Sequence, residues 1–380
     1  MTNEMLRTND TKAMRLLVAL ELSASKWQLA AGVEGQPRKR VKTVAGGDYV
    51  ALAEAIVEIK ERFKLTVDAP VVFCYEAGRD GFYPYRRLQE SGHTVWVVDS
   101  ASIEVSRHAR RAKSDGIDAE KLLELMQRKA GGEHRALRLV RVPELKDEDL
   151  RHLPREREVL LKDRVRLLNQ IESALFLHGY REIPQSSRAL RPWLEERRDM
   201  GVQLRERLER EVERLTLVES QILAVEKRLK ERMYEEDSGA IGRVALALMQ
   251  LCSIGLISAW VLASEIYGWR LFHNRKEVGA VLGLTPTPYS SGNDQREQGI
   301  SKAGNRRARA LLIELAWLWL RYQPESAISL WFQERFGGAG KRSRRVGIVA
   351  LARRLAVALW RYSTQGIVPE GAKMKHVVSA

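Results

Sequence analysis

Four acidic side chains in the first third of the chain have the types and spacing of a divalent-metal site. Glu21 ends an apolar run of strand length, and Glu76 comes directly after a second run, Val71–Tyr75. Asp115 and Asp118 lie three residues apart at a predicted helix start, so a helix would turn both to one side. Carboxylates at the ends of neighbouring strands meet at one edge of an open sheet. Such oxygens suit Mg²⁺, and paired ions stabilise the attacking and leaving oxygens of phosphodiester chemistry.

Each of these acids also has a plainer interpretation. Asp115 and Asp118 could cap a helix, where each would contribute about 0.3–1 kcal/mol through the helix dipole. Glu76 stands two residues before Gly78 and could be ordinary turn polarity. Only the order of the set, on strand, strand and helix, favours a metal site, so both interpretations stay open.

A serine pair in the last third is the second candidate. Ser290 and Ser291 precede Gly292 in TPTPYSSGNDQREQG, which alone is typical of a plain turn. A basic cluster comes next, at a predicted helix start, and helix-start amides and arginines together bind phosphate. A nearby serine hydroxyl could attack a phosphodiester and conserve its bond energy as a phosphoserine link. The phosphate-binding candidates are Lys302, Asn305, Arg306, Arg307 and Arg309.

The elements that must position these residues differ between the two ends of the chain. The apolar runs predict a mixed α/β sheet, with strands over 15–22, 26–33, 38–44, 71–75 and 94–98 and helices over 50–63, 83–90 and from 115. An apolar seam from Leu204 to Met233 predicts a long helix that packs on another subunit or on a helix of the same chain. Prolines 154, 184 and 192 should interrupt the helices of this region. The last third should be helical, with loops at 285–299 and 337–345.

The charge of the chain is concentrated in its last third. Its 64 Lys+Arg and 49 Asp+Glu give a net charge of +15, which favours a nucleic-acid partner. By segment, residues 1–140 carry 23 − 19 = +4, residues 141–240 carry 21 − 22 = −1, and residues 241–380 carry 20 − 8 = +12. The uncharged stretch 244–264 is long enough for a membrane span, but a central glycine, Gly255, favours two short helices. We therefore expect no membrane partner. Because Cys74 and Cys252 fit neither a disulfide framework nor a metal site, we expect a cytoplasmic protein.

Six motifs, in order along nearly the whole chain, carry a family resemblance. They are LLVALELSASKWQLA, VVFCYEAGRDGF, AKSDGIDAEKL, LCSIGLISAWVLASEI, FHNRKEVGAVLGLTPTPYSSG and GISKAGNRRARALL. The chain resembles the DEDD-type transposases of bacterial insertion sequences, which include Piv-like DNA invertases and bridge-RNA-guided serine recombinases. The resemblance implies a RuvC-like, RNase H-type domain over 1–142, a helical coiled-coil region over 143–238, and a serine-containing helical transposase domain over 239–380. Residues 254–256 would form a helix-hairpin-helix-like element.

The resemblance also implies roles for the candidate residues. Glu21, Glu76, Asp115 and Asp118 would be the four catalytic acids that bind Mg²⁺. Ser291 would be the nucleophile, with Ser290 as the alternative. The implied partners are donor and target DNA, a structured guide RNA, and further copies of the chain in a dimer or tetramer.

One residue departs from the family pattern. The first acid of the family is normally aspartate, whereas this chain has Glu21, whose extra methylene moves the carboxylate outward by roughly one bond. Either the site adjusts, or a subgroup uses glutamate, or activity is impaired. Two further hypotheses therefore remain beside the RNA-guided recombinase: a metal-only RuvC-like junction nuclease, and a catalytically degenerate nucleic-acid-binding protein.

Overall fold

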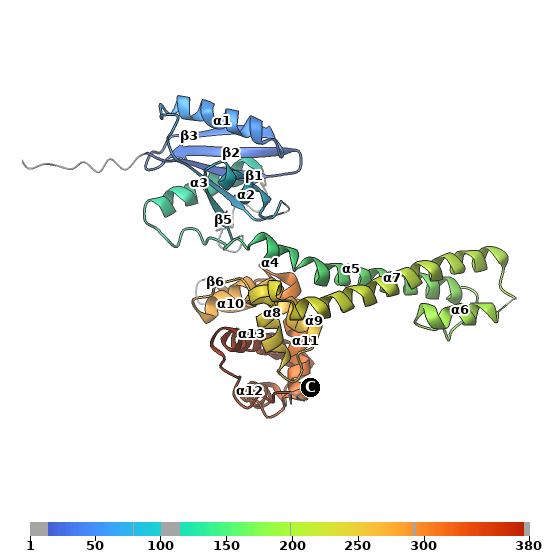
Figure 1. Cartoon of the computed structure of the whole chain (residues 1–380). Coiled ribbons are helices and arrows are strands. Elements are labelled where there is room, and N and C mark those ends of the chain that lie inside the picture. The colour runs from blue at the N-terminus through green and yellow to red at the C-terminus, as the bar shows by residue number, and fades with distance from the viewer. Residues whose placement is uncertain (1–13, 79, 100–114, 198, 292–293, 376–380) are drawn as a thin grey trace, which may run out of the picture. The chain divides into compact units, whose positions relative to one another are not determined.

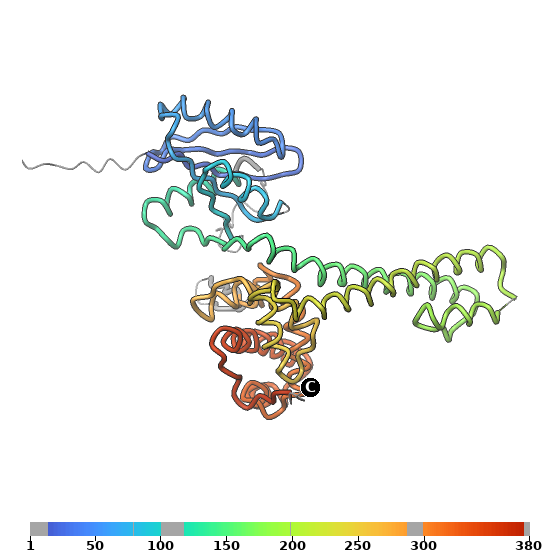
Figure 2. The backbone as a smooth tube through the Cα atoms, viewed as in Figure 1, coloured from blue at the N-terminus to red at the C-terminus, as the bar shows by residue number. Residues whose placement is uncertain are grey.

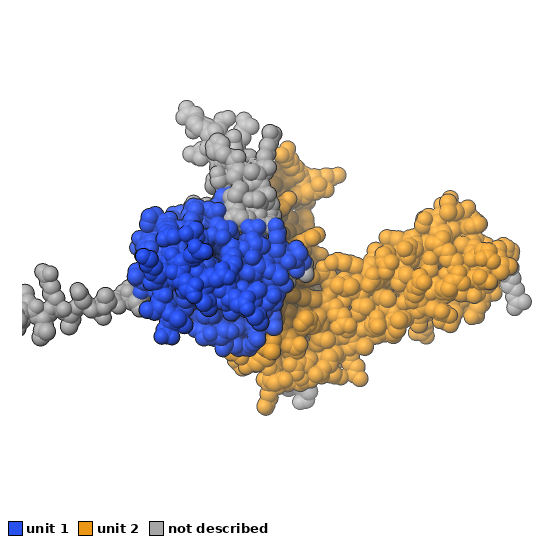
Figure 3. All heavy atoms as spheres, turned by 90° about the horizontal axis from the view of Figure 1, so that it is seen from above, with its two compact units in different colours: residues 1–142 blue, residues 143–380 orange. Residues whose placement is uncertain are grey.

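A computed structural model describes residues 14–78, 80–99, 115–197, 199–291 and 294–375 of the chain. These residues divide into two compact units, one within residues 1–142 and the other within 143–380, which Figure 3 colours separately. The first expected segment has the bounds of unit 1. The second and third expected segments lie together in unit 2.

Unit 1 is built on one five-stranded sheet with the strand order β3-β2-β1-β4-β5 (Figure 1). Its strands are β1 (Leu16–Leu22), β2 (Lys26–Val33), β3 (Lys39–Ala45), β4 (Val71–Glu76) and β5 (Thr94–Val98). The first three strands pair antiparallel, whereas β1, β4 and β5 are parallel neighbours. The mixed α/β fold expected from the sequence is confirmed, and its strand order is consistent with an RNase H-like domain.

Helices cover both faces of this sheet because β1 is apolar on both sides. Leu16, Val18 and Leu20 pack with α1 (Tyr49–Arg62) and α2 (Tyr83–Glu90). Leu17 and Ala19 face the other way and pack with α3 (Asp115–Ala130). Such alternation is what a strand buried on both faces requires. The two faces therefore have different surroundings, and α3 alone of the described helices contributes to the second core cluster.

Unit 2 begins with four helices, of which the second and the fourth form an antiparallel hairpin. They are α4 (Leu145–Asp149), α5 (His152–Phe176), α6 (Ser187–Glu195) and α7 (Val202–Tyr234). Ion pairs Arg157–Glu226 and Arg164–Glu219 join α5 to α7 at 2.6 and 3.0 Å. The residue number rises by seven on α5 while it falls by seven on α7, which is the register of antiparallel helices (Figure 2). The apolar seam of α7 is therefore buried within the same chain, against α5 and α6 in its first half and in the helical core of unit 2 in its second half.

The rest of unit 2 is a helical core that carries one β-hairpin. Its elements are η3 (Glu236–Ser238), α8 (Gly239–Met249), α9 (Leu256–Leu262), a π-helical turn η4 (Ala263–Tyr267), α10 (Arg275–Val281), β6 (Pro286–Ser291), β7 (Asp294–Ile300), α11 (Arg306–Tyr322), α12 (Ala327–Phe336) and α13 (Lys341–Gln365). Trp260, Trp319 and Phe332 are fully buried in its core. The uncharged stretch forms α8, a turn and α9, as the central glycine indicated. No helix within the described ranges is long and apolar enough to cross a membrane.

Three local expectations were wrong. Where a loop over 285–299 was expected, residues 286–291 and 294–300 pair as the antiparallel strands β6 and β7. The loop expected over 337–345 ends at Gly340, since the cations from Lys341 onward belong to the first turns of α13. Pro192 lies inside α6 and does not end it.

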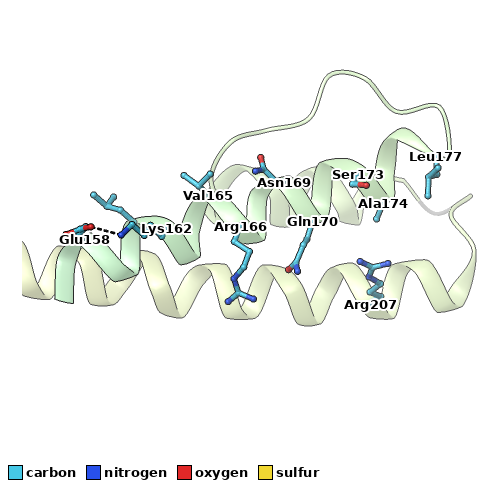
Figure 4. Close-up of a pocket in the computed structure, with 11 residues that line it drawn as sticks. Glu158, Lys162, Val165, Arg166, Asn169, Gln170, Ser173, Ala174, Leu177 and Arg207 are labelled. Carbon is cyan, nitrogen blue, oxygen red and sulfur yellow. Dashed lines mark hydrogen bonds and ion pairs between the residues drawn. The ribbon is translucent and has the colours of Figure 1, made fainter. Parts of the chain in front are cut away.

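A groove of about 780 Å³ runs beside α5 in the helical hairpin (Figure 4). Its wall consists of α5 residues from Glu158 to Ala174, the C-cap residue Leu177, and Arg207 of α7. The Glu158 carboxylate is already paired with Lys162, as drawn in Figure 4, and with Arg307. None of the candidate site residues lines this groove, so the chemistry must be sought elsewhere.

Candidate functional site

Glu21 and Glu76 stand at the same end of two adjacent parallel strands. Leu20 of β1 pairs with Tyr75 of β4, and each acid is the next residue along its strand. Because side chains alternate along a strand, Glu21 shares the face of Ala19, and Glu76 shares that of its own second neighbour, Cys74. Ala19 and Cys74 both belong to the core beneath α3. Both carboxylates therefore belong to the sheet face that α3 covers, with Glu21 half-buried and Glu76 exposed.

Asp118 comes to the same end of that face because α3 runs opposite to β1. Near the C-terminus of α3, the Gln127 Nε2 atom donates to the Val33 carbonyl at 2.9 Å, and Val33 pairs with Leu16 at the start of β1. Asp118 lies nine residues earlier in the helix, about 14 Å along its axis. Glu21 lies five residues along β1, about 17 Å from its start. The first turn of α3 and the C-terminal ends of β1 and β4 are thus at one end of the sheet.

The donor chemistry of these acids fits a hard divalent cation, but the described side chains do not close a site. Among the residues that the structure describes, no three His, Cys, Asp or Glu side chains lie close enough together to hold a metal ion. Asp115 begins α3, and its side chain lies outside the described part of the chain. Glu21, Glu76 and Asp118 are thus placed on one face at one end, without forming a three-ligand cluster.

Tyr75 holds the segment that comes after Glu76. The Tyr75 hydroxyl donates to the Gly81 carbonyl at 3.1 Å and accepts from the Tyr85 backbone N–H at 3.2 Å. This fully buried ring therefore ties the segment after β4 back to the sheet on the face opposite to Glu76. These two hydrogen bonds anchor the end of β4 on the opposite face of the sheet, which restrains the backbone at Glu76.

In unit 2, Ser291 is the last residue of β6 and lies at the tip of the hairpin. Its backbone pairs with that of Asp294, the first residue of β7, and Ser290 pairs with Gln295. The side chains of residues 287–298 lie outside the described part of the structure. The backbone alone therefore locates both candidate nucleophiles at the end of a two-stranded projection.

The base of this hairpin is locked to the start of α11 by two close backbone approaches. Gly283 has φ +63°, and a Cβ there would lie 2.0 Å from the Ala303 carbonyl oxygen. Gly304 has φ +91°, and a Cβ there would lie 2.2 Å from the Val281 carbonyl oxygen. Only glycine fits these positions, because both the conformation and the space exclude a side chain. The hairpin thus leaves and re-enters the helical core at a fixed place.

The basic cluster after the hairpin divides into exposed and engaged side chains. Lys302 and Arg306 are exposed, and Lys302 adopts the left-handed region with φ 57°, which is unfavourable for a residue with a Cβ. Arg307 forms an ion pair with Glu158 of α5. The Nη1 atom of Arg309 donates to the Leu282 carbonyl at 2.9 Å, and the Asn305 side chain accepts from the Ala308 N–H as the N-cap of α11. Lys302 and Arg306 are therefore the members best placed to meet a phosphate.

A buried carboxylate, Glu265 in the π-helical turn, organises the start of α11. Its oxygens accept from the Nε and Nη2 atoms of Arg155 at 2.8 and 3.1 Å, and from the Nδ2 atom of Asn305 at 2.8 Å. Only 3% of Glu265 is exposed. Arg151 lies in the same region, buried and stacked on the Trp269 ring at 4.4 Å. This carboxylate therefore ties α5 to the residue that caps α11.

The pKa of Glu265 is set by opposing effects. Burial raises it, but the hydrogen bond and charge of Arg155 outweigh burial, so that the pKa lies below its ordinary value of 4.5. A carboxylate with a depressed pKa in the folded state stabilises the fold above its unfolded pKa, and this contribution is lost as the pH falls. Glu265 therefore contributes its full stabilisation at neutral pH.

Replacing Glu265 by glutamine should lower the free energy of unfolding by about 2 kcal/mol at pH 7. Removal of one partner from a fully buried ion pair costs roughly 3–5 kcal/mol, and the partial exposure of Arg155 reduces this cost. The difference between variant and parent should shrink as the pH falls below 4.5, the ordinary pKa of glutamate. Urea unfolding followed by circular dichroism at pH 7 and at pH 4 measures both effects.

The matched control is Glu226→Gln, which breaks the half-exposed pair with Arg157 on the helical hairpin. This change should lower the free energy of unfolding by less than about 1 kcal/mol at both pH values. If both variants lost the same free energy of unfolding at pH 7, the buried Glu265 would stabilise the fold no more than the half-exposed Glu226 does.

Sequence reasoning missed Glu265, Arg155 and Arg151, because none of them belongs to a recognisable catalytic or binding motif. The available signal was that Glu265 directly follows the uncharged stretch 244–264. A lone acid in so apolar a context is rarely buried unless it is paired. Its partner could not be found from the sequence because Arg155 lies 110 residues away.

Comparison with known proteins matches both units. The family model described as "Transposase IS116/IS110/IS902 family" matches residues 245–329, and a second transposase model, of the DEDD type, matches residues 25–181. The "Putative transposase y4rJ" of Sinorhizobium fredii is 40% identical over 378 residues, covering 95% of this chain and 94% of the relative.

More distant relatives carry the names of insertion sequences. The "Transposase for insertion sequence element IS1328" of Yersinia enterocolitica is 26% identical, over 79% of this chain and 85% of the relative. The "Transposase for insertion sequence element IS1111A" of Coxiella burnetii is 26% identical, over 69% of each protein. The high identity to y4rJ over almost the full length, together with the two model matches, decides the assignment. The chain belongs to the IS116/IS110/IS902 family and is a DEDD-type transposase of an insertion sequence.

Proposed function

We propose that this transposase cuts and rejoins DNA with Ser291 as its nucleophile, with Mg²⁺ held by the acids of unit 1, under the guidance of a structured RNA. The observation that carries the serine mechanism is the position of Ser291 at the tip of a hairpin whose base is locked beside the start of α11. A nucleophile on a projection can reach a DNA backbone, while the fixed base keeps Lys302 and Arg306 next to that projection.

The serine step is a phosphoryl transfer that conserves one phosphodiester-type bond throughout. The Ser291 Oγ atom attacks the DNA phosphorus and loses its proton, the phosphoserine bond forms, and the P–O bond to the leaving strand breaks and yields a free hydroxyl. In the second step the hydroxyl of another strand attacks the phosphoserine, and the serine hydroxyl is restored. No external energy source is needed, because a bond of similar energy is kept at each stage.

The proposed metal ligands are Glu21, Glu76, Asp115 and Asp118. The DEDD domain implies a divalent metal, and Mg²⁺ supplies charge to stabilise the oxygens that enter and leave phosphorus. Glu21, Glu76 and Asp118 share the end of the α3 face, and Asp115 lies three residues before Asp118 at the helix start. The carboxylates themselves bind and orient the cation, and α3 and the sheet hold them in place.

Within the basic cluster the proposed roles differ. Lys302 and Arg306 bind phosphate, since both are exposed, and the strained backbone of Lys302 is typical of functional positions. Arg307 would reach DNA only on release from Glu158. Asn305 and Arg309 position the cluster, because their side chains hold the helix cap and the Leu282 carbonyl.

The proposed partners follow from the reaction. A transposase acts on DNA, and joining donor to target DNA requires several strand cuts, so we propose a dimer or tetramer as the active form. Because the seam of α7 is buried within its own chain, we propose that another surface supplies the contact between subunits.

The RNA guide makes a prediction about what accompanies the purified protein. We expect the chain, expressed with its flanking DNA and washed in moderate salt, to retain one discrete structured RNA transcribed from beside its own gene. Sequencing of the bound nucleic acid measures this, and the Ser291→Ala variant should retain the same RNA because the serine acts on DNA. A mixture of unrelated cellular RNAs would contradict RNA guidance.

A further inference from the structure

A groove of about 1390 Å³ runs along one face of α13 in unit 2. Its residues on α13 recur every three or four positions from Lys341 to Arg361, which defines a single helix face about 30 Å long. The opposite wall includes Pro286, Gly299 and Ile300 at the base of the hairpin. We call this feature the α13 groove.

The α13 groove is lined by cations and by no acid. Its cations are Arg275, Lys276, Lys302, Lys341, Arg342, Arg345, Arg353, Arg354 and Arg361. None of them forms an ion pair with an acid within the described residues, although ion pairs are frequent elsewhere in unit 2. The crowding has a cost, since burial and the nearby Arg335 lower the pKa of Arg354. Uncompensated positive charge of this density requires an anionic partner.

The floor of the same groove is apolar. Leu284, Ile300, Ile328, Val349 and Val357 line it, together with Trp331. The guanidinium of Arg354 lies 3.9 Å from the centre of the Trp331 ring, and the indole Nε1 atom has no hydrogen-bond partner among the described residues. The surface therefore combines cationic side chains with an apolar lining.

We propose that the α13 groove binds a single, unpaired DNA strand, with phosphates on its cationic side chains and bases and sugars on its apolar floor. Duplex DNA presents mainly phosphates and would leave the floor empty, whereas an unpaired strand exposes base faces that pack on apolar and aromatic surfaces. The groove includes the base of the hairpin that carries Ser291, so a strand lying in it leads to the proposed nucleophile. The inference rests on the proposed function in this one respect, that the serine acts on DNA.

The test is equilibrium binding of full-length protein to a fluorescein-labelled DNA single strand of mixed sequence, its duplex, and the matching RNA strand. The paired change Arg345→Ala and Arg361→Ala should raise Kd for the DNA single strand roughly tenfold at physiological salt. It should also reduce the slope of log K against log salt by about 1.4, or 0.7 for each lost phosphate contact. Duplex binding should change less.

The charge-matched control is the paired change Arg344→Ala and Arg321→Ala. Both arginines are exposed and lie outside the lining of the groove, so the single-strand Kd should change less than threefold, roughly. Equal weakening by the two pairs, or unchanged binding in the groove variant, would overturn the inference. Tighter binding of the RNA strand than of the DNA strand would overturn the assignment to DNA.

The result of this binding test does not depend on whether the serine mechanism is correct. Binding is measured without strand exchange, and the Ser291→Ala protein should bind the DNA single strand like the parent. Recombination that proves independent of Ser291 would therefore remove the proposed function and leave the binding result intact. Circular dichroism of both paired variants checks that each is folded.

Discussion

Replacement of Ser291 by alanine should lower strand exchange roughly a thousandfold or more while DNA binding is unchanged. Alanine removes only the hydroxyl oxygen that would attack phosphorus, and the hairpin backbone at this position pairs with Asp294 through groups that alanine retains. A plasmid assay that joins donor to target DNA measures the first quantity, and an electrophoretic shift with donor DNA measures the second.

The neighbouring serine supplies the matched control. Ser290→Ala removes the same atom one residue earlier in β6. Activity should remain within about threefold of the parent, because in the proposed mechanism Ser291 alone attacks phosphorus. If Ser290→Ala were the inactive variant, the nucleophile would be Ser290, and full activity in both variants would exclude a serine mechanism at this hairpin.

Loss of a carboxylate from unit 1 should strongly lower Mg²⁺-dependent strand cleavage. Glu21→Gln should lower Mg²⁺-dependent strand cleavage roughly a hundredfold or more, because an amide keeps the size of the side chain and removes the charge that a hard cation requires. Glu76→Gln should have a similar effect, since Glu76 ends the neighbouring strand on the same sheet face. Cleavage of labelled donor DNA across a range of Mg²⁺ concentrations measures both losses.

Two controls sharpen this prediction. Glu21→Asp introduces the residue type that the family resemblance leads us to expect at this position, and it should retain activity within about tenfold because the charge stays at the end of β1. Glu54→Gln removes an exposed carboxylate from α1, on the other face of the sheet, and should leave cleavage unchanged. An active Glu21→Gln variant would show that Glu21 is not a metal ligand.

The elements of unit 1 could be predicted because their signals are local. Strands such as β2 and β5 have the bounds that their apolar runs indicated, and α2 begins and ends at the expected residues. The pairing of β4 with β1 explains why Glu21 and Glu76 lie at the same end of the sheet although they are 55 residues apart in the chain. The direction of α3 relative to β1 brings Asp118 to that end. The contact of Gln127 with Val33 shows this direction, and the local sequence pattern could not predict it.

The elements of unit 2 were less accessible because their contacts span long separations. The seam of α7 required a partner, but nothing in its repeat distinguished a second subunit from α5. The prolines and glycines of 285–299 predict a loop and hide the weak alternation of β6 and β7, whose pairing is evident only from the structure. Glu265 carried no motif, and its role is evident only from its contacts with Arg155 and Asn305.

The structure shows where much of the positive charge of the last third of the chain lies. The net charge of +12 in residues 241–380 indicated only that an anion would bind there. Nine of its basic side chains line the α13 groove, and Lys302 belongs both to that groove and to the proposed phosphate cluster. The distribution therefore points to one continuous surface on unit 2, from α13 to the start of α11.

The central claim is that a serine, rather than a metal-activated water, attacks the DNA. Reaction of the protein with donor DNA, a denaturing quench and peptide mass spectrometry of the nuclease-digested adduct tests it most directly. We expect a nucleotide joined through phosphate to the peptide that contains Ser291, and no such adduct from Ser291→Ala protein. Cleaved DNA without any covalent adduct would contradict the serine mechanism and would favour the metal-only nuclease.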